Sequence, residues 1–321
     1  MRGYSGPESR SPGSIEIRAG VDERYPDIYT HDALRVIEAL ARFDQDRKEV
    51  MEARMVNRAS RYRDQERTQF LDPDAMIPRT DISVQDARSG NFVGATIPHD
   101  LKRQWIQGTG PAAKPNVPLE RSIRNVAYAL LSGADGWMFD GEDALGQTST
   151  MALDNQRNLK LALSGEEIFL NVAEGVAEEM NTWSQVFLGR DIIDDWRKQL
   201  GYTTIIFRPR GLHLDDRHIR NSNGLGFSAA IVDTCLFLVN NHQALRDAGR
   251  SLVLYIPKIQ TAEEAAVWDN ILAALEEHLD LDIGTIKAYV LIEQVETAFQ
   301  LMEIRAALGR HFVGYNTWRW D

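Results

Sequence analysis

The pattern of apolar residues changes after about residue 91. From there, short apolar runs alternate with segments that carry apolar residues at helical spacing. Because strands buried on both faces alternate with helices in parallel α/β proteins, we predict a parallel sheet covered by helices. The runs are FVGATIP (92–98), GWMFDGED (136–143), TTIIFRPRG (203–211), SLVLYIPK (251–258), IKAYVLIE (286–293) and HFVGYN (311–316).

Polar residues gather at the carboxyl ends of these runs. A (β/α)₈ barrel places its chemistry there, and so does a doubly wound sheet, which usually shows an early G-x-G-x-x-G loop that this chain lacks. We therefore predict a TIM-barrel type of α/β fold that is incomplete, with about six of eight strands. The residues are Asp140, Glu142, Asp143, Arg208, Arg210, Lys258 and Glu293.

The segment before the predicted barrel has a different composition and pattern. Residues 1–15 are rich in Ser, Gly and Pro, which predicts a disordered start. Residues 30–58 show a helical pattern with Thr30 as N-cap, so we expect a helical region over 16–90 and the barrel over 91–321. Within the barrel, Thr261 and Glu264 have the spacing of a capping box.

Composition excludes several classes of partner. The formal net charge of −11 disfavours nucleic acid and anionic membranes as partners, because both attract basic surfaces. No stretch approaches 18 uninterrupted apolar residues, and the single cysteine, Cys235, fits a reducing compartment. We expect a cytoplasmic protein.

Two carboxylates are candidates for a metal site. Glu293 and Asp321 both follow adjacent strand runs, so their side chains should converge to within roughly 6 Å and share one Mg²⁺. His278 and His311 lie at a helix end and a strand start, on the wrong side of the sheet, which argues against zinc.

A second cluster combines acids with a cation. The three acids of DGED (140–143) repel one another unless a cation lies near, and FRPRG offers Arg208 and Arg210 by the same strand-end argument. Pro209 interrupts the strand between them, so we expect at most one Arg to face the mouth of the barrel.

Six ordered motifs resemble the malate synthase family, in its shorter A-type branch. The resemblance runs from about residue 97 to Asp321 and is most specific over 255–299. The motifs are FDGED, DNQRNLKLAL, RPRGLHLDDRH, YIPKIQTAEEAAVWDNI, GTIKAYVLIEQVETAFQLMEI and WRWD.

The resemblance implies a (β/α)₈ barrel with an N-terminal helical clasp, and the Mg²⁺-dependent condensation of acetyl-CoA with glyoxylate and water to malate and CoA, as in the glyoxylate cycle. It implies that Arg208, rather than Arg210, stabilises the enolate of acetyl-CoA. It also implies that Glu293 and Asp321 bind Mg²⁺, that Asp140 and Glu142 surround the waters of the metal, and that Trp320 and Asp321 bind substrate.

The chain departs from the family pattern in two respects. The family takes its catalytic base from a Met-Glu-Asp-Ala-like motif in a C-terminal domain, and these 321 residues contain no such motif. We therefore expect an N-terminal portion that a complementing C-terminal chain would complete. Trp318 stands where the family usually has glycine, in a turn whose backbone binds the glyoxylate carboxylate; a large side chain there would obstruct that pocket.

Two alternatives remain from the sequence. A CoA-ester lyase of the citrate lyase β-subunit or malyl-CoA lyase kind would share the strand-end Arg, the Pro-Lys strand and the Glu/Asp pair. A non-catalytic fragment or pseudoenzyme would fit Trp318 and the absent base. RPRGLHL, QRNL and the long N-terminal region favour malate synthase.

Overall fold

A computed structural model describes residues 15–102, 106–107, 117–143 and 150–317. Trp318, Trp320 and Asp321 lie outside the described residues, and so does nearly all of the segment predicted to be disordered. The division of the chain into three domains stays a prediction.

The main sheet is parallel throughout and has the order β2-β3-β4-β7-β8-β9. Within the described residues this row of strands does not close into a barrel, which agrees with the predicted incomplete TIM-barrel type. The strands are β2 (Ile106–Gln107), β3 (Gly136–Asp140), β4 (Thr204–Arg208), β7 (Leu252–Ile256), β8 (Ile286–Ile292) and β9 (Phe312–Thr317).

One predicted strand is wrong. Residues 92–98 form an irregular segment that leads into the 3₁₀ turn η1 (His99–Leu101), and the first strand of the sheet is the short β2. The side chains of Val93 and Ile97 are 63% and 41% exposed, whereas a strand of a helix-covered parallel sheet is buried on both faces. The apolar run was therefore a misleading signal.

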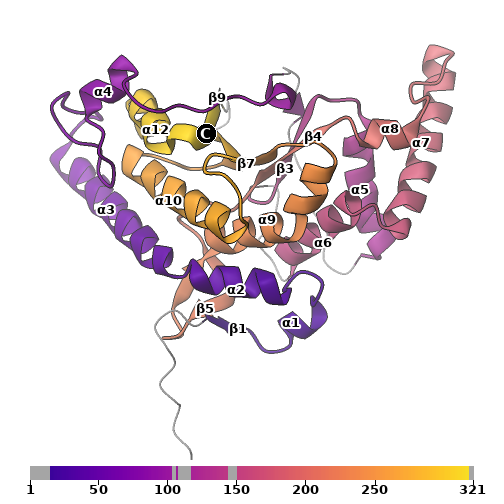
Figure 1. Ribbon diagram of the computed structural model, residues 1–321, viewed down its shortest axis with the longest axis horizontal. Helices are drawn as coiled ribbons and strands as arrows, with labels where there is room; N and C mark the ends of the chain where they lie inside the picture. Colours follow the sequence, from indigo (N-terminus) through magenta and orange to yellow (C-terminus); the bar gives the residue numbers. More distant parts are fainter. Residues whose placement is uncertain (1–14, 103–105, 108–116, 144–149, 318–321) are drawn as a thin grey trace, which may run out of the picture.

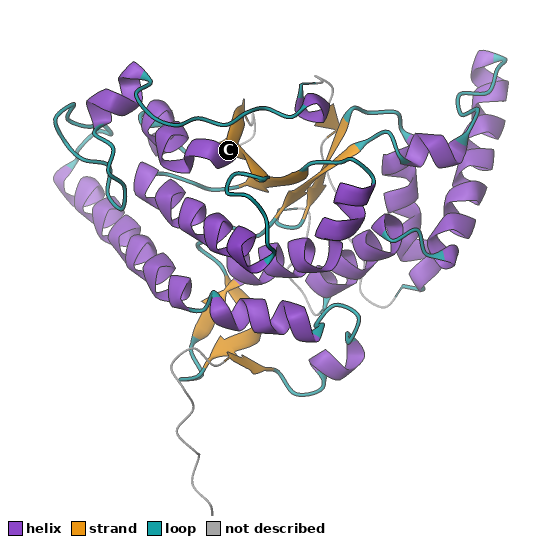
Figure 2. Cartoon of the chain, viewed as in Figure 1, coloured by secondary structure: helices purple, strands orange, loops and turns teal. Residues whose placement is uncertain are grey.

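Helices cover the sheet, and Figures 1 and 2 show α9 and α10 lying across one of its faces. Among the described helices, none is long and apolar enough to cross a membrane. The barrel-region helices are α5 (Leu119–Leu131), α6 (Met151–Leu163), α7 (Glu167–Leu188), α8 (Trp196–Leu200), α9 (Ala229–Asp247), α10 (Ala262–His278), α11 (Val295–Ala298) and α12 (Leu301–Leu308), the last followed by the 3₁₀ turn η2 (Gly309–His311).

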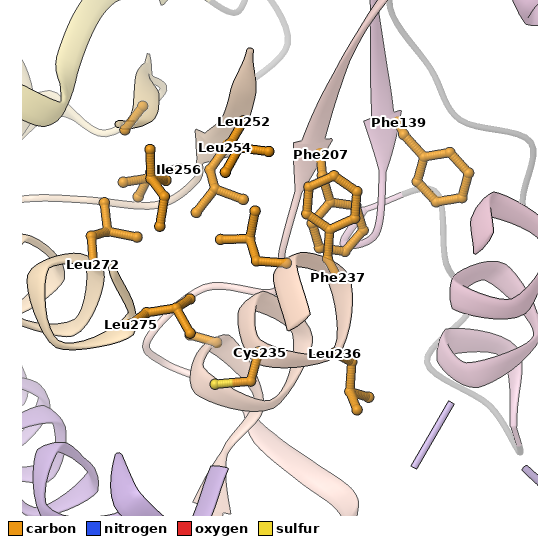
Figure 3. Close-up of a cluster of buried hydrophobic side chains, with 14 of the residues drawn as sticks. Phe139, Phe207, Cys235, Leu236, Phe237, Leu252, Leu254, Ile256, Leu272 and Leu275 are labelled. Carbon is orange, nitrogen blue, oxygen red and sulfur yellow. The ribbon is translucent and has the colours of Figure 1, made fainter. Parts of the chain in front are cut away.

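The sheet is buried on both faces. Phe207 of β4 stacks on Phe237 of α9 with ring centroids 4.6 Å apart, within the large apolar cluster of Figure 3. The alternate residues, among them Ile206 and Val253, form a second cluster on the other face, to which Leu101 of η1 also belongs. Burial of both sets explains why the strand runs are almost continuously apolar.

The N-terminal region supplies β1 (Ile15–Ile17) and the helices α1 (Val21–Arg24), α2 (His31–Ala39), α3 (Arg42–Asp64) and α4 (Val84–Ser89). The helix predicted over 30–58 is two helices, since the first ends at Ala39 and α3 continues to Asp64. Thr30 caps the first helix as predicted, because its hydroxyl accepts a hydrogen bond from the N–H of Ala33 at 3.2 Å.

A small antiparallel sheet lies outside the predicted elements. It has the order β1-β5-β6, and its hairpin of β5 (Asp215–Asn221) and β6 (Gly226–Ser228) is inserted between β4 and α9. The polar sequence DDRHIRN gives β5 little apolar signal, yet Asp216 and His218 are buried. The hairpin brings β1 beside the barrel region.

Candidate active site

Four carboxylates and two cations meet at the carboxyl ends of four neighbouring strands. Asp140 is the last residue of β3 and pairs in register with Arg208, the last residue of β4. Lys258 follows β7 by two residues and Glu293 follows β8 by one. Because the strands are parallel, their carboxyl ends lie on the same side of the sheet, and the sheet itself assembles the cluster. We call this cluster the mouth; it consists of Asp140, Glu142, Asp143, Arg208, Lys258 and Glu293.

Arg208 is the centre of the mouth and is only 1% exposed. Its Nη2 donates to Glu142 and, at 2.6 Å, to Asp143, and it lies 3.7 Å from Glu293 Oε2. Its Nη1 lies 3.5 Å from Asp140 Oδ2. Its Nε is buried and has no hydrogen-bond partner among the described residues. Burial opposes the charge of Arg208, but the surrounding carboxylates outweigh it and raise the pKa of the guanidinium.

Glu142 is the acid most affected by this crowding. Burial raises its pKa to about 8; Asp143 and Glu293 add to the rise, whereas Arg208 and Lys258 oppose it. Its N–H donates to Asp140 Oδ1 at 2.8 Å, which fixes the turn between the two acids. Gly141 is required in that turn, because a Cβ atom would lie 2.6 Å from the carbonyl oxygen of Arg208.

Lys258 joins Glu293 to the mouth, although the only prediction made for it was its position at a strand end. Its backbone N–H donates to Glu293 Oε1 at 2.6 Å, and its Nζ donates to Oε2 at 2.7 Å. The same Nζ lies 3.5 Å from Asp143 Oδ2. Lys258 has a φ of 57°, which is uncommon for a residue with a side chain.

Arg210 lies outside the mouth. Its guanidinium binds Asp233 and Asp216, with its Nη2 at 2.7 Å and 2.6 Å from their carboxylate oxygens. Strand β4 ends at Arg208, so the alternation of side chains does not continue through Pro209 to Arg210. Only one of the two arginines faces the mouth, as expected, and it is Arg208.

The remaining predicted site residues separate into two groups. Trp320 and Asp321, with Trp318, lie outside the described residues, so their approach to Glu293 stays a prediction. His311 lies at the amino end of β9, where its ring contacts Asp269 and Glu276 at 2.6 Å and 3.0 Å. It therefore lies at the amino ends of the strands, opposite the mouth, as predicted from the sequence.

The mouth has a surplus of negative charge. With all groups ionised, the four carboxylates outnumber Arg208 and Lys258 by two charges, and protonation of Glu142, whose pKa is raised to about 8, leaves a surplus of one near pH 7. His213 does not change this balance, because burial, aided by the charges of Arg54 and Lys258, lowers its pKa to about 4 and leaves it neutral near pH 7. Carboxylate oxygens are the ligands Mg²⁺ prefers, so the donor set fits that ion. In the described part of the chain, however, no three His, Cys, Asp or Glu side chains converge closely enough to form a metal site.

Comparison with known proteins agrees with this architecture. Residues 204–321 match the family model of the malate synthase TIM barrel domain. The chain is 30% identical to the glyoxysomal malate synthase of Brassica napus over 315 residues, which cover 97% of this chain and 49% of that protein. It is 30% identical to the malate synthase of Myxococcus xanthus over 98% of this chain and 51% of that protein. Malate synthase A of Escherichia coli is 32% identical over 70% of this chain and 37% of its own length. The chain spans about half the length of the curated relatives it matches.

Proposed function

Because the chain belongs to the malate synthase family, we propose that it carries the barrel part of an acyltransferase. The proposed reaction condenses acetyl-CoA with glyoxylate and water to give malate and CoA. This reaction belongs to the glyoxylate cycle, which operates beside the tricarboxylic acid cycle. The observation that carries the proposal is the mouth, where a buried, permanently charged Arg208 lies among four strand-end carboxylates. We also propose a cytoplasmic location, on the basis of the single buried cysteine.

Arg208 is the residue proposed to act on acetyl-CoA. Loss of a proton from the acetyl methyl group places negative charge on the thioester oxygen. A guanidinium held rigidly by carboxylates can donate hydrogen bonds to that oxygen without losing its own proton. The partnerless Nε of Arg208 is a donor that the described residues leave for such a contact.

Glu293 and Asp321 are proposed to hold Mg²⁺, with Asp140 and Glu142 hydrogen-bonding its waters and Trp320 and Asp321 contacting substrate. Each Glu293 oxygen accepts a hydrogen bond from Lys258, which holds the carboxylate in one orientation at the mouth. When bound, the ion would polarise the glyoxylate aldehyde and neutralise its carboxylate. The surplus of negative charge at the mouth supports a divalent cation there.

The base that removes the acetyl proton is proposed to come from a complementing polypeptide segment. The 321 residues contain no Met-Glu-Asp motif, the described sheet is not closed, and the relatives are about twice as long. Trp318, which stands in place of the usual glycine, lies outside the described residues, so obstruction of the glyoxylate pocket stays a prediction.

The test is a complementation assay. The purified chain is incubated with acetyl-CoA, glyoxylate and Mg²⁺, alone and with the separately expressed C-terminal half of the Myxococcus xanthus relative, and malate and free CoA are measured. We expect no malate from the chain alone, malate from the mixture, and none when Arg208→Lys replaces the wild type. Cleavage of malyl-CoA without condensation would favour a CoA-ester lyase, and a soluble complex without any turnover would favour a non-catalytic protein.

A further inference from the structure

Lys258 occupies a conformation that its surroundings must impose. It is one of four non-glycine residues with positive φ in the described part of the chain, and the only one of these at the mouth. Left-handed backbone is unfavourable for a residue with a Cβ atom, so it persists only where neighbouring contacts determine it. The contacts of Lys258 therefore show which groups maintain this part of the mouth.

Glu293 and Arg54 both bind Lys258, through different groups of that residue. The backbone N–H and the Nζ of Lys258 both donate to Glu293, while its carbonyl oxygen accepts a hydrogen bond from Arg54 Nη1 at 2.8 Å. Arg54 lies in the middle of α3, which packs against α10 (Figure 1). A helix of the N-terminal region thus contacts the backbone of a residue that binds the proposed metal ligand.

Glu264 in turn orients Arg54. Its carboxylate Oε2 lies 3.6 Å from Arg54 Nη1 and accepts the N–H of Gln260 at 2.8 Å. Glu264 is 1% exposed, at the start of α10, where Thr261 caps the helix. Since α10 follows the strand that ends just before Lys258, Glu264 and Lys258 belong to one strand-loop-helix unit that Arg54 bridges.

We propose that Arg54 is a positioning residue that holds the Lys258 carbonyl and thereby keeps Lys258 in the left-handed conformation in which its N–H and Nζ both reach Glu293. The inference rests on the proposed function only in treating Glu293 as a ligand of Mg²⁺. The arrangement makes the affinity of the mouth for a cation depend on the N-terminal helix α3.

The test compares variants of the 321-residue chain. Arg54→Met removes the donor to the Lys258 carbonyl. Arg54→Lys keeps a positive charge and an ammonium group that can donate to that carbonyl. Arg61→Met is the matched control: Arg61 lies two turns further along α3 and lines the same polar cavity of about 300 Å³, but it pairs with Glu296 and not with Lys258. Because that cavity is polar, water can occupy the space left by Arg54, and we expect every variant to fold, as circular dichroism would verify.

Two readouts are measured for each variant. Amide hydrogen exchange of a peptide spanning residues 256–260 reports the Lys258 N–H bond to Glu293, and calorimetric titration with Mg²⁺ reports cation affinity. We expect exchange at least about tenfold faster and affinity about 10- to 100-fold weaker in Arg54→Met, the range typical of groups that support metal ligands. Arg54→Lys should be intermediate and Arg61→Met should match the wild type.

The outcomes separate the inference from the function on which it rests. Faster exchange in Arg54→Met, without Mg²⁺ binding by any variant or by the wild type, would support the positioning role and contradict the proposed metal site. Wild-type exchange in Arg54→Met, together with a crystal structure in which Lys258 keeps its positive φ and both bonds to Glu293, would overturn the positioning role.

Discussion

Arg208 and Arg210 are two residues apart and almost equally buried, at 1% and 3% exposure, yet their surroundings differ. Arg210 is shared by two acids whose oxygens are all engaged. Asp233 accepts its N–H, Nε and Nη2, and Asp216 accepts Nη2 together with the backbone N–H groups of His218 and Ile219. Arg208 is shared by four acids and keeps one buried donor without a partner in the described chain.

The pKa shifts of the acids show the consequence of this difference in pairing. Burial opposes ionisation of Asp216, but Arg210 and the backbone donors outweigh it and lower its pKa. Burial raises the pKa of Glu142 to about 8, and the charges of Asp143 and Glu293 add to the rise, so the opposing charges of Arg208 and Lys258 do not offset it. A cluster with matched partners stabilises the fold, whereas a cluster with a surplus charge is suited to bind an ion or substrate at some cost in stability.

Asp233→Asn should give the largest effect. It removes the carboxylate that accepts three bonds from Arg210 and leaves a buried guanidinium with one acid, so we expect a loss of about 3–5 kcal/mol in the free energy of unfolding. Chemical denaturation would measure it, with Glu49→Gln as the control, because Glu49 binds the more exposed Arg79. A loss no larger than that of the control would contradict a structural role for the Arg210 cluster.

His311 tests whether a second matched cluster behaves like that of Arg210. Although burial opposes protonation, hydrogen bonds and charge from Asp269 and Glu276 raise its pKa to about 9. A raised histidine pKa contributes stability that is full below the unfolded value of 6.5 and is lost as pH rises through 9. We expect a loss of about 3 kcal/mol over that window, since one pKa unit is about 1.4 kcal/mol.

The comparison for that window is His311→Gln, which cannot titrate. Its free energy of unfolding should vary less between pH 6.5 and pH 9 than that of the wild type. Parallel curves for the two proteins would show that His311 is not the protonated partner of Asp269 and Glu276.

Glu142→Gln should give the smallest effect, of opposite sign. An acid whose pKa is raised on folding contributes stability below its unfolded value of 4.5, and that stability is lost as pH rises through 8. In EDTA, we expect the variant to gain about 1 kcal/mol over the wild type between pH 5 and pH 8, a modest part of the full linkage because half-exposed Asp143 admits water. A variant that is less stable than the wild type at pH 8 would place Glu142 in a matched cluster.

Much of the fold could be predicted because five strands are apolar runs buried on both faces, and their length and spacing are visible in the sequence. The run at 92–98 failed because sequence does not reveal that Val93 and Ile97 face solvent. The β5–β6 hairpin was missed because its buried residues include Asp216 and His218, whose burial depends on Arg210 and backbone partners rather than on apolar character.

The mouth was predictable for a related reason, since parallel strands bring their carboxyl ends together and the sequence shows polar residues there. The roles of Lys258 and Arg54 were not predictable. One depends on a positive φ, and the other on a contact between residues 204 positions apart, which no local pattern encodes.

We propose that the surplus of acid around Arg208 forms a site for a divalent cation. The most direct measurement is thermal unfolding of the chain with and without Mg²⁺, for the wild type, Glu293→Gln and Glu303→Gln, a buried acid that Arg88 pairs outside the mouth. A ligand that binds only the folded state at 100 times its dissociation constant adds about 2.7 kcal/mol. We expect Mg²⁺ to raise the Tm of the wild type and of Glu303→Gln but not that of Glu293→Gln. An unchanged wild-type Tm, or an equal rise in all three proteins, would contradict it.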